Sequence, residues 1–218
     1  MLFSGGLDSA VLLAMELHAG HGAQPLHIRA GLAWEDAEAR AIGRILAQPP
    51  FAGRALPVKT LTVDMRDVYP ASHWAIRGEP PAYDTPDEDV YLEGRNIVLI
   101  SKAAVLCARL ELDRLVLGPL AGNPFPDATP EFFETLARAM SLGLGRPLSI
   151  AAPLARMHKE DVIKLGLELR VPLESTLSCM NPAGDRHCGR CSKCRERHTA
   201  FAAAAVDDST EYATAPGP

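Results

Sequence analysis

The sequence SGGLDS at residues 4–9 is the first segment whose residue types and spacing could do chemistry. Its two adjacent glycines allow backbone angles and a close approach that a β-carbon would prevent. Backbone N–H groups of such a loop, with the N-terminus of a following helix, can bind phosphate or pyrophosphate, and Ser4 and Ser9 add hydroxyl donors. Asp8 would repel a bare anion, so it indicates a phosphate chelated to a metal ion.

The loop matches neither the Walker pattern GxxxxGK[ST] nor the dinucleotide pattern GxGxxG. The alternative is an ordinary tight turn in which Ser9 caps a helix. Only three residues, Met1–Phe3, precede the loop, whereas a central parallel strand usually has about five. We therefore expect either a truncated central strand or a natural start a few residues upstream.

Four of the five cysteines form a second candidate site with the spacing C-x8-C-x2-C-x2-C: Cys179, Cys188, Cys191 and Cys194. Four thiolates at these spacings suit a tetrahedral zinc ion, which would be structural because no coordination position stays open. An iron–sulfur cluster is the alternative. His187 and His198 flank the cluster and are expected to lie outside the ligand set, while Cys107 is expected to be a small core residue.

Composition restricts the class of protein. The chain has 218 residues, of which 47% are hydrophobic, enough for one domain with a small appendage. A formal net charge of −5 argues against a broad nucleic-acid surface. No apolar run approaches the roughly 20 residues of a membrane span, and no secretory pattern leads the chain. We expect a soluble, cytoplasmic protein whose crowded cysteines bind metal in a reducing compartment.

Apolar periodicity predicts strands that alternate with helices. Besides the residues before the glycine loop, strands are expected at 25–32, 57–65, 114–118 and 148–154. Helices are expected at 10–19, 35–47, 97–112, 131–144, 159–169 and 195–205. Residues 66–94 form a long irregular stretch, which in a compact domain is more often functional than idle.

This alternation predicts an α/β fold of the Rossmann-like type, a doubly wound parallel sheet covered on both faces. Ligands of such sheets bind beyond the carboxyl ends of the strands, so the site is expected in the loops 4–9, 31–36, 64–95, 118–129 and 152–158. We expect three parts: an α/β domain with the phosphate-binding loop at 1–170, a zinc-binding segment with a helix at 171–205, and a disordered tail at 206–218.

The glycine loop resembles the signature SGGxDS of the PP-loop ATP pyrophosphatases, which cleave ATP to AMP and pyrophosphate while they adenylate an oxygen atom. Together with the cysteines it resembles one branch, the 7-cyano-7-deazaguanine synthases and their ExsB-like relatives. Further matches are EGRN at 93–96, the pair Pro126–Asp127 in PFPDATPEFF, the segment PLARMHKEDVIKLG with Lys159, and STLSC before Cys179. The resemblance spans about residues 3–200.

The resemblance implies that ATP and ammonia convert 7-carboxy-7-deazaguanine to the nitrile through an amide, with Mg²⁺ accompanying ATP and zinc in a structural role. The expected catalytic residues are Asp8, Lys159 and Arg95. The expected ATP-binding residues are Phe3, Ser4, Gly5, Gly6, Leu7, Asp8, Ser9, Arg95 and Asn96. For the substrate, Asp127 is expected to bind the guanine-like edge, and Phe125 or Trp34 to stack on the ring.

Each of these assignments has a structural alternative. Arg95 could neutralise the acidic sequence DTPDED at 84–89, and Lys159 could be an exposed first-turn lysine. Asp127 could only make a turn after Pro126. Trp34 could pack at the sheet edge, and Asn96 could only cap a helix.

The sequence also departs from the family near the expected substrate pocket. Ala128 and Thr129 replace a Cys-Arg pair, which removes a guanidinium, and AGLAWEDAE at 30–38 replaces a YGQ-type segment with histidine. A competing interpretation is therefore another carboxylate substrate, or transfer of a deazaguanine to another acceptor. A non-catalytic zinc-ribbon module is the alternative of another class, and SGGLDS argues against it. The sequence is compatible with a homodimer.

Overall fold

The computed structural model describes residues 1–217 of the chain. Its named strands form two parallel pairs. Strands β1 (Leu26–Arg29) and β2 (Lys59–Thr62) make one pair, and β3 (Arg114–Val116) and β4 (Ser149–Ala151) make the other. The parallel pairing confirms the predicted α/β class.

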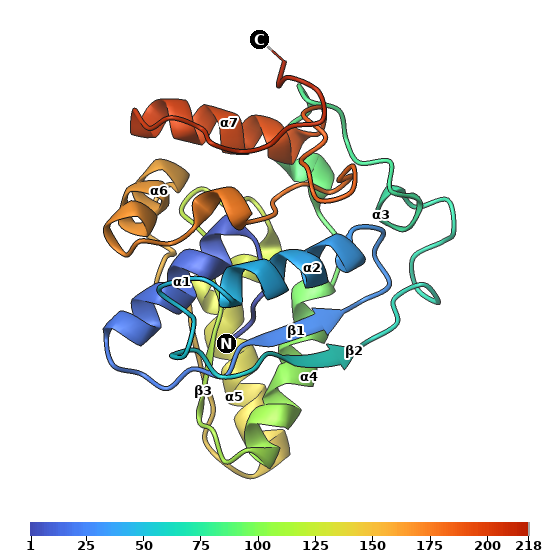
Figure 1. The fold of residues 1–218 in the computed structure, drawn as a ribbon. Coiled ribbons are helices and arrows are strands. Elements are labelled where there is room, and N and C mark those ends of the chain that lie inside the picture. Colours follow the sequence, from blue (N-terminus) through green and yellow to red (C-terminus); the bar gives the residue numbers. More distant parts are fainter. Residues whose placement is uncertain (218) are drawn as a thin grey trace.

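The first three residues join the two pairs into one sheet. The N–H of Leu2 donates to the carbonyl of Val116 in β3 (2.9 Å), and the N–H of Phe3 donates to the carbonyl of Leu26 in β1 (2.8 Å). Leu26 in turn donates to the carbonyl of Met1 (2.9 Å). The sheet order is therefore β2–β1–(Met1–Phe3)–β3–β4, with the short segment before the glycine loop at its centre (Figure 1).

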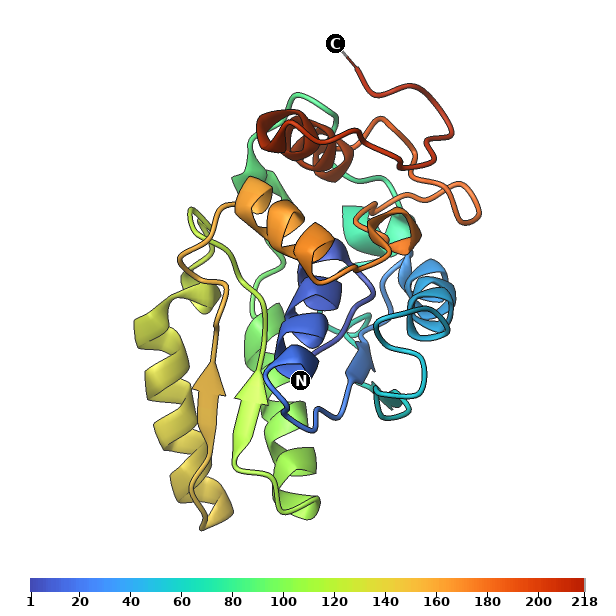
Figure 2. The ribbon, with the colours of Figure 1, turned by 60° about the vertical axis from the view of Figure 1, so that its left-hand side comes forward.

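Helices cover both faces of this sheet (Figures 1 and 2). The core on one face includes α1 (Leu7–His18), α2 (Glu35–Leu46), α6 (Lys159–Glu168) and, outermost, α7 (Ser192–Ala204). The core on the other face includes α4 (Arg95–Arg109) and α5 (Pro130–Leu144), which lie along β3 and β4. Short helical turns are α3 (Trp74–Arg77), η1 (Asp87–Val90), η2 (Pro126–Ala128) and η3 (Leu173–Ser175).

Helix α1 is the most deeply buried of the long helices because apolar residues occupy nearly its whole circumference. Leu7, Val11, Leu12 and Leu13 are each at most 1% exposed. Full burial of such a side chain contributes roughly 1.5–3 kcal/mol. The helix that follows the glycine loop is thus fixed between the sheet and α6, which holds its N-terminus in place.

The C-terminal part of the chain does not form a separate body. Ala200, Phe201 and Ala204 of α7 belong to the same core as α1 and α6. The sequence boundary near residue 170 therefore marks a change of composition, while the packing continues across it.

The tail differs from the disorder expected for 206–218. Residues 206–217 run back over α7 and the cysteine segment, and Pro218 lies outside the described residues. The buried guanidinium of Arg197 donates to Thr210 Oγ1 (2.6 Å), and the N–H of His187 donates to the carbonyl of Glu211 (2.9 Å). Because the buried cation of Arg197 needs acceptors, it orders a polar segment that has few core residues of its own.

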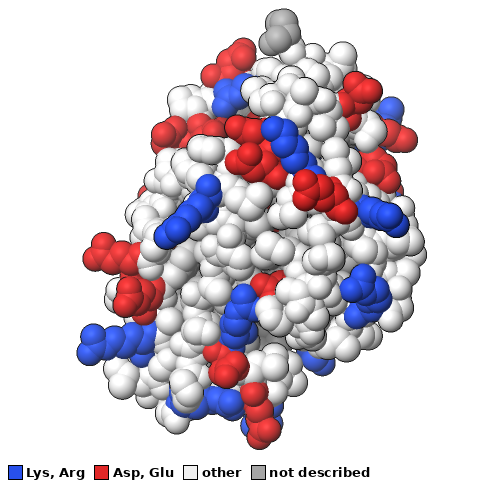
Figure 3. Space-filling model, turned by 90° about the vertical axis from the view of Figure 1, so that its left-hand side faces the viewer, with Lys and Arg blue, Asp and Glu red and all other residues white. Residues whose placement is uncertain are grey.

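Charged side chains of both signs are interspersed on the face in Figure 3, and the described residues on that face form no continuous basic area. Among residues 1–217, no helix is both long and apolar enough to cross a membrane.

The contact between α1 and α6 yields a stability prediction. A β-carbon on Gly166 would lie 2.9 Å from Val11 Cγ2 and 3.0 Å from Leu173 Cδ2, so Gly166→Ala must displace buried side chains. We expect it to lower the free energy of unfolding by about 1–3 kcal/mol in chemical denaturation.

Gly143 in α5 is the matched control. A β-carbon there meets no atom within 4 Å, so Gly143→Ala should stabilise the chain by about 0.5–1 kcal/mol through helix propensity alone. Equal effects of the two substitutions would contradict the packing argument.

Candidate functional site

The glycine loop follows the central strand and turns directly into α1. Gly5 has a φ of +76°, and a β-carbon there would lie 3.0 Å from Ile42 Cγ1, so both the angle and the space require glycine. The carbonyl of Gly5 accepts from the N–H of Leu177 (2.9 Å), and the Ser4 and Ser9 hydroxyl oxygens lie 3.4 Å apart. A fixed loop at a helix N-terminus is a suitable phosphate site.

Asp8 and Lys159, distant in sequence, form an ion pair beside this loop. The Lys159 ammonium donates to Asp8 Oδ2 (2.7 Å) and also pairs with Glu196 (3.0 Å), which pairs in turn with Lys193 (2.5 Å). We refer to Asp8, Lys159, Glu196 and Lys193 as the ion chain. Burial alone would lower the pKa of Lys159, but the carboxylates of Asp8 and Glu196 outweigh burial and raise it.

A cavity of about 480 Å³ opens over the glycine loop and the ion chain. At one end it is lined by Asp8, Lys159, Lys193 and Glu196. At the other end it is lined by aromatic side chains: Trp34, Trp74 and Phe125. The larger cavity thus combines a charged end with an aromatic end.

A second cavity of about 260 Å³ also borders the loop. Its walls include Phe3, residues 26–28 of β1, and Asn96 and Leu99 of α4. The two cavities share part of their lining: Ser4, Gly6, Asp8, Glu38, Arg95, Gly118, Pro119, Asn123 and Phe125. They therefore meet at the glycine loop.

Arg95 is the cation at this junction. It is the first residue of α4 and lines both cavities. Among residues 1–217 its side chain makes no ion pair, and its Nε is buried without a hydrogen-bond partner. Asp87 of the acidic segment pairs instead with Arg195 (3.0 Å), so the described contacts do not support the neutralising role considered for Arg95.

Asn96 and Asp127 bind each other. Asp127 Oδ2 accepts from the backbone N–H of Asn96 (3.0 Å), and the Asn96 side-chain amide donates to Asp127 Oδ1 (3.3 Å) and to its carbonyl (3.0 Å). Asp127 is 5% exposed and lines neither cavity, and burial raises its pKa. Through these contacts Asp127 supports the start of α4.

The aromatic end of the larger cavity is a set of stacked rings. Trp34 and Trp74 stack with centroids 5.8 Å apart and an interplanar angle of 12°. Phe125 stacks on Tyr91 (5.2 Å). Trp34 is 6% exposed and packed, as the structural alternative expected, yet it also lines the cavity with the half-buried Trp74.

The departures at Ala128 and Thr129 lie outside both cavities. Thr129 caps α5, because its hydroxyl accepts from the N–H of Phe132 (3.2 Å). The departure at 30–38 does reach the site, through Trp34 and Glu38. Of the two departures from the family, only the one at residues 30–38 can therefore affect the choice of substrate through direct contact in these cavities.

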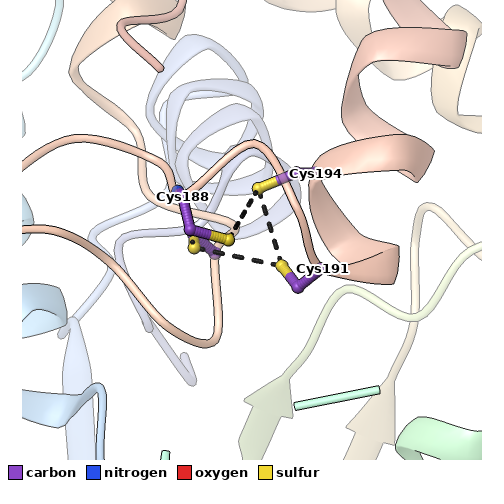
Figure 4. A group of neighbouring side chains, drawn as sticks. Cys188, Cys191 and Cys194 are labelled. Carbon is purple, nitrogen blue, oxygen red and sulfur yellow. Dashed lines mark hydrogen bonds between the residues drawn. The ribbon is translucent and has the colours of Figure 1, made fainter. Parts of the chain in front are cut away.

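The cysteine cluster forms as its spacing predicts. The four sulfurs lie within 4.8 Å of one another, with Cys179–Cys191 at 3.9 Å, Cys188–Cys194 at 3.8 Å and Cys191–Cys194 at 3.5 Å (Figure 4). Backbone N–H groups of residues 181, 188 and 190 point at two of the sulfurs. The cluster could hold a metal ion.

Gly189 makes the turn of this segment possible. Its φ is +77°, and a β-carbon would lie 1.9 Å from the carbonyl oxygen of Thr214 in the tail. Cys107 is buried in α4, remote from the cluster. His187 lies beside the cluster as a hydrogen-bond acceptor for the N–H of Ser178 (3.0 Å).

Sequence reasoning missed several site residues: Glu38, Trp74, Lys193 and Glu196. Lys193 lies between two of the cysteines and Glu196 just after the last, in a basic sequence that by itself suggests a solvated surface. The cysteines could have indicated otherwise, because a helix that starts at a metal-binding cysteine has a fixed orientation. Glu38 lies on α2, the amphipathic helix that follows β1, where a carboxylate ordinarily faces water.

Comparisons with known proteins fit this geometry. The model of the family "Queuosine biosynthesis protein QueC" matches residues 1–205. A 7-cyano-7-deazaguanine synthase of Anaeromyxobacter dehalogenans is 36% identical, over 98% of this chain and 94% of the relative. One from Methanothrix thermoacetophila is 34% identical, over 97% of this chain and 96% of the relative.

The chain belongs to the QueC family. This membership confirms the resemblance found in the sequence and the expectation of an ATP-dependent synthase of queuosine biosynthesis. In this QueC-family chain the alignment extends across the glycine loop, the aromatic end of the larger cavity and the cysteine cluster.

Solved structures show the same fold at low sequence identity. A 4-thiouridine synthetase in complex with RNA and ATP has a TM-score of 0.51 at 18% identity, covering 97% of this chain and 46% of that one. A predicted subunit of a tRNA methyltransferase from Methanocaldococcus jannaschii has a TM-score of 0.50 at 18% identity, covering 77% and 72%. These likenesses confirm the Rossmann-like architecture of the QueC-family chain.

The ion chain predicts a pH dependence of stability. Burial would raise the pKa of Glu196, but Lys159 and Lys193 lower it from 4.5 to about 2. A depressed carboxyl pKa stabilises the fold above the unfolded value, and this contribution is lost as the pH falls from about 4.5 to about 2. Chemical denaturation at a series of pH values should show that the free energy of unfolding of the wild type falls by about 2–3 kcal/mol over this range. In Glu196→Gln this decrease should be absent.

The control for this measurement is Glu168→Gln, an exposed position on α6. It should keep the acid-dependent loss of the wild type. If Glu196→Gln kept the same loss, the ion pairs of Glu196 would carry none of the predicted stabilisation.

Proposed function

We propose that this chain converts 7-carboxy-7-deazaguanine to 7-cyano-7-deazaguanine with ammonia, cleaving ATP to AMP and pyrophosphate. The observation that carries the proposal is the junction of two cavities at the glycine loop, one with an aromatic end and one bordered by β1 and α4. An adenylating enzyme needs two organic ligands to meet at one phosphate, and this arrangement provides that meeting point. The names of the aligned relatives support the substrate.

In this proposal the adenosine occupies the smaller cavity, and the pyrophosphate lies between the glycine loop and the charged end of the larger one. The flat base of the substrate lies against Trp34, Trp74 and Phe125. Its carboxylate then reaches the junction, where the unpaired guanidinium of Arg95 faces it. Developing negative charge on the phosphate would be stabilised by Arg95 and Lys159.

Asp8 has one oxygen available for a magnesium ion carried by ATP. Its Oδ2 accepts from Lys159, whereas its buried Oδ1 has no hydrogen-bond partner among residues 1–217. A buried carboxylate oxygen suits Mg²⁺, which would neutralise charge on the phosphates when bound. Lys159 holds the Asp8 carboxylate in this orientation.

We also propose that the cysteine cluster holds zinc. A tetrahedral ion with Zn–S bonds of about 2.3 Å places its sulfurs about 3.8 Å apart. Three of the sulfur separations here are 3.5–3.9 Å, and all of them lie within 4.8 Å. Four thiolates leave no open position, so the zinc would stabilise the segment that delivers Lys193 and Glu196 to the larger cavity.

A second substrate is favoured by one observation. Trp34 belongs to the segment that departs from the family and stacks on Trp74 at the cavity wall. This wall would accept another planar carboxylate as well as a deazapurine. The chemistry at the junction would be the same.

The proposal predicts ammonia-dependent product from purified protein. With ATP, Mg²⁺, ammonium and 7-carboxy-7-deazaguanine, we expect pyrophosphate release and, by mass spectrometry, the nitrile. Asp8→Ala should lower pyrophosphate release by about 10²-fold or more, because the metal-facing carboxylate is lost. Asp113→Ala, an exposed site before β3, should leave it unchanged.

If pyrophosphate is released with another planar carboxylate but not with 7-carboxy-7-deazaguanine, the other carboxylate is the substrate and the proposed one is contradicted. Release by Asp8→Ala at the wild-type rate would remove Asp8 from the mechanism.

For the metal, we expect about one zinc ion per chain in freshly purified protein. Cys191→Ser should lower the bound zinc and reduce the Tm by about 5–10 °C, since about 2–4 °C corresponds to each kcal/mol in a chain of this size. Cys107→Ser, at a buried position remote from the cluster, should leave the zinc content unchanged. Metal analysis that finds iron with acid-labile sulfide would instead identify an iron–sulfur cluster.

A further inference from the structure

The proposed reaction releases protons at the junction of the two cavities. Ammonia attacks the carbonyl carbon of the acyl adenylate, a C–N bond forms, and the C–O bond to AMP breaks with its electron pair on AMP. The nitrogen must lose one proton to give the amide. In the second round the O-adenylated amide loses two protons from nitrogen as its C–O bond to AMP breaks and the nitrile forms. When the nitrogen source is ammonium, one more proton must be removed before the attack.

A proton acceptor for these steps must lie where both cavities meet. Of the described residues that line both cavities, three carry a charged or titratable side chain: Asp8, Glu38 and Arg95. Asp8 is ion-paired to Lys159, and the guanidinium of Arg95 has N–H donors but no acceptor. Among residues 1–217, Glu38 is therefore the titratable group at the junction that no ion pair occupies.

The position of Glu38 is set by the backbone. It lies in the first turn of α2, and its own carbonyl lies 3.3 Å from the place of a β-carbon on Gly5, so the helix packs directly against the glycine loop. The residue is only 8% exposed, and it lines both cavities. We propose that Glu38 accepts the proton lost by the attacking nitrogen and acts as the general base of ammonia addition.

Its neighbour Glu35 shows that this role is specific to Glu38. The Glu35 carboxylate accepts from the N–H groups of Ala30 and Gly31 and lies 3.7 Å from Arg29 Nε. It is thus committed to holding the loop after β1. Glu38 has no such backbone partner among the described hydrogen bonds.

The electrostatic surroundings suit the role. Burial raises the pKa of Glu38 to about 7, with a smaller contribution from Glu35, and Arg95, Trp34 and Arg29 oppose the rise. Across the junction stand Asp8 and Lys159, which neutralise each other. A base is most effective when its pKa lies near the working pH, since it is then both free to accept a proton and strong enough to hold it.

The inference rests on the proposed function, and Glu38→Gln separates the two. The amide keeps the shape but cannot accept a proton. Pyrophosphate leaves before ammonia attacks, so we expect its release in the first turnover with 7-carboxy-7-deazaguanine to stay within a few-fold of wild type. Formation of amide and nitrile from ammonia should fall by about 10²-fold or more. Hydroxylamine is largely unprotonated near neutral pH, so trapping of the acyl adenylate as hydroxamate should fall far less.

Two variants serve as controls. Asp36→Asn, at an exposed carboxylate on the same helix, should behave as wild type in all three assays. Glu38→Asp keeps a carboxylate at a shorter reach and should recover part of the ammonia-dependent rate, which also tests the role if Glu38→Gln folds poorly.

Three results would overturn the inference. Glu38→Gln with wild-type yields of amide would show that the proton goes elsewhere. An equal loss of pyrophosphate release in the first turnover would place Glu38 in the ATP site. Glu38→Asp, folded and releasing pyrophosphate yet no better than Glu38→Gln with ammonia, would mean that the carboxylate is not the acceptor. By contrast, wild-type protein that releases no pyrophosphate with this carboxylate would contradict the proposed function, and the general base with it.

Discussion

One lysine holds together the parts of the chain that make the site. Lys159 begins α6, Asp8 lies in the first turn of α1, and Glu196 lies on α7 after the last cysteine. Their charges meet at 2.7 and 3.0 Å in a mostly buried position. A buried ammonium without partners would be costly, so the lysine requires both carboxylates at once. This electrostatic requirement therefore acts together with the shared apolar core to place the glycine loop, α6 and the cysteine segment relative to one another.

The four cysteines line neither cavity. They nevertheless influence the site, because they position a helix that carries one partner of Lys159. Cys191 precedes α7 and Cys194 lies in its first turn, so the cluster fixes where that helix starts. Lys193 and Glu196 follow from that start, and Arg195 reaches across to Asp87 and the carbonyl of Thr85. The cluster thus aligns one wall of the larger cavity through the helix that its own ligands begin.

The sequence predicts a feature well when all of its residues are close together in the chain, and poorly when the feature depends on contacts between distant segments. The glycine loop and the four cysteines are local patterns, so their geometry followed from spacing. Lys159 came from the family resemblance. Glu38 and Glu196 are single acidic residues on helices, and only the packing of those helices turns them inward. Asp127 is the opposite case: its sequence neighbourhood predicts a substrate ligand, and the packing shows a contact that the sequence did not indicate, in which both carboxylate oxygens accept hydrogen bonds from Asn96.

The segment 66–94 carries Trp74, while the phosphate cradle belongs to the central strand and α1. The aromatic wall of the larger cavity and the glycine loop therefore lie on parts of the chain that can change independently. Insertions or exchanges in the irregular segment would alter the shape of that wall and leave the glycine loop unchanged. The glycine loop and the aromatic wall are therefore structurally separate, and a change in one leaves the backbone of the other in place.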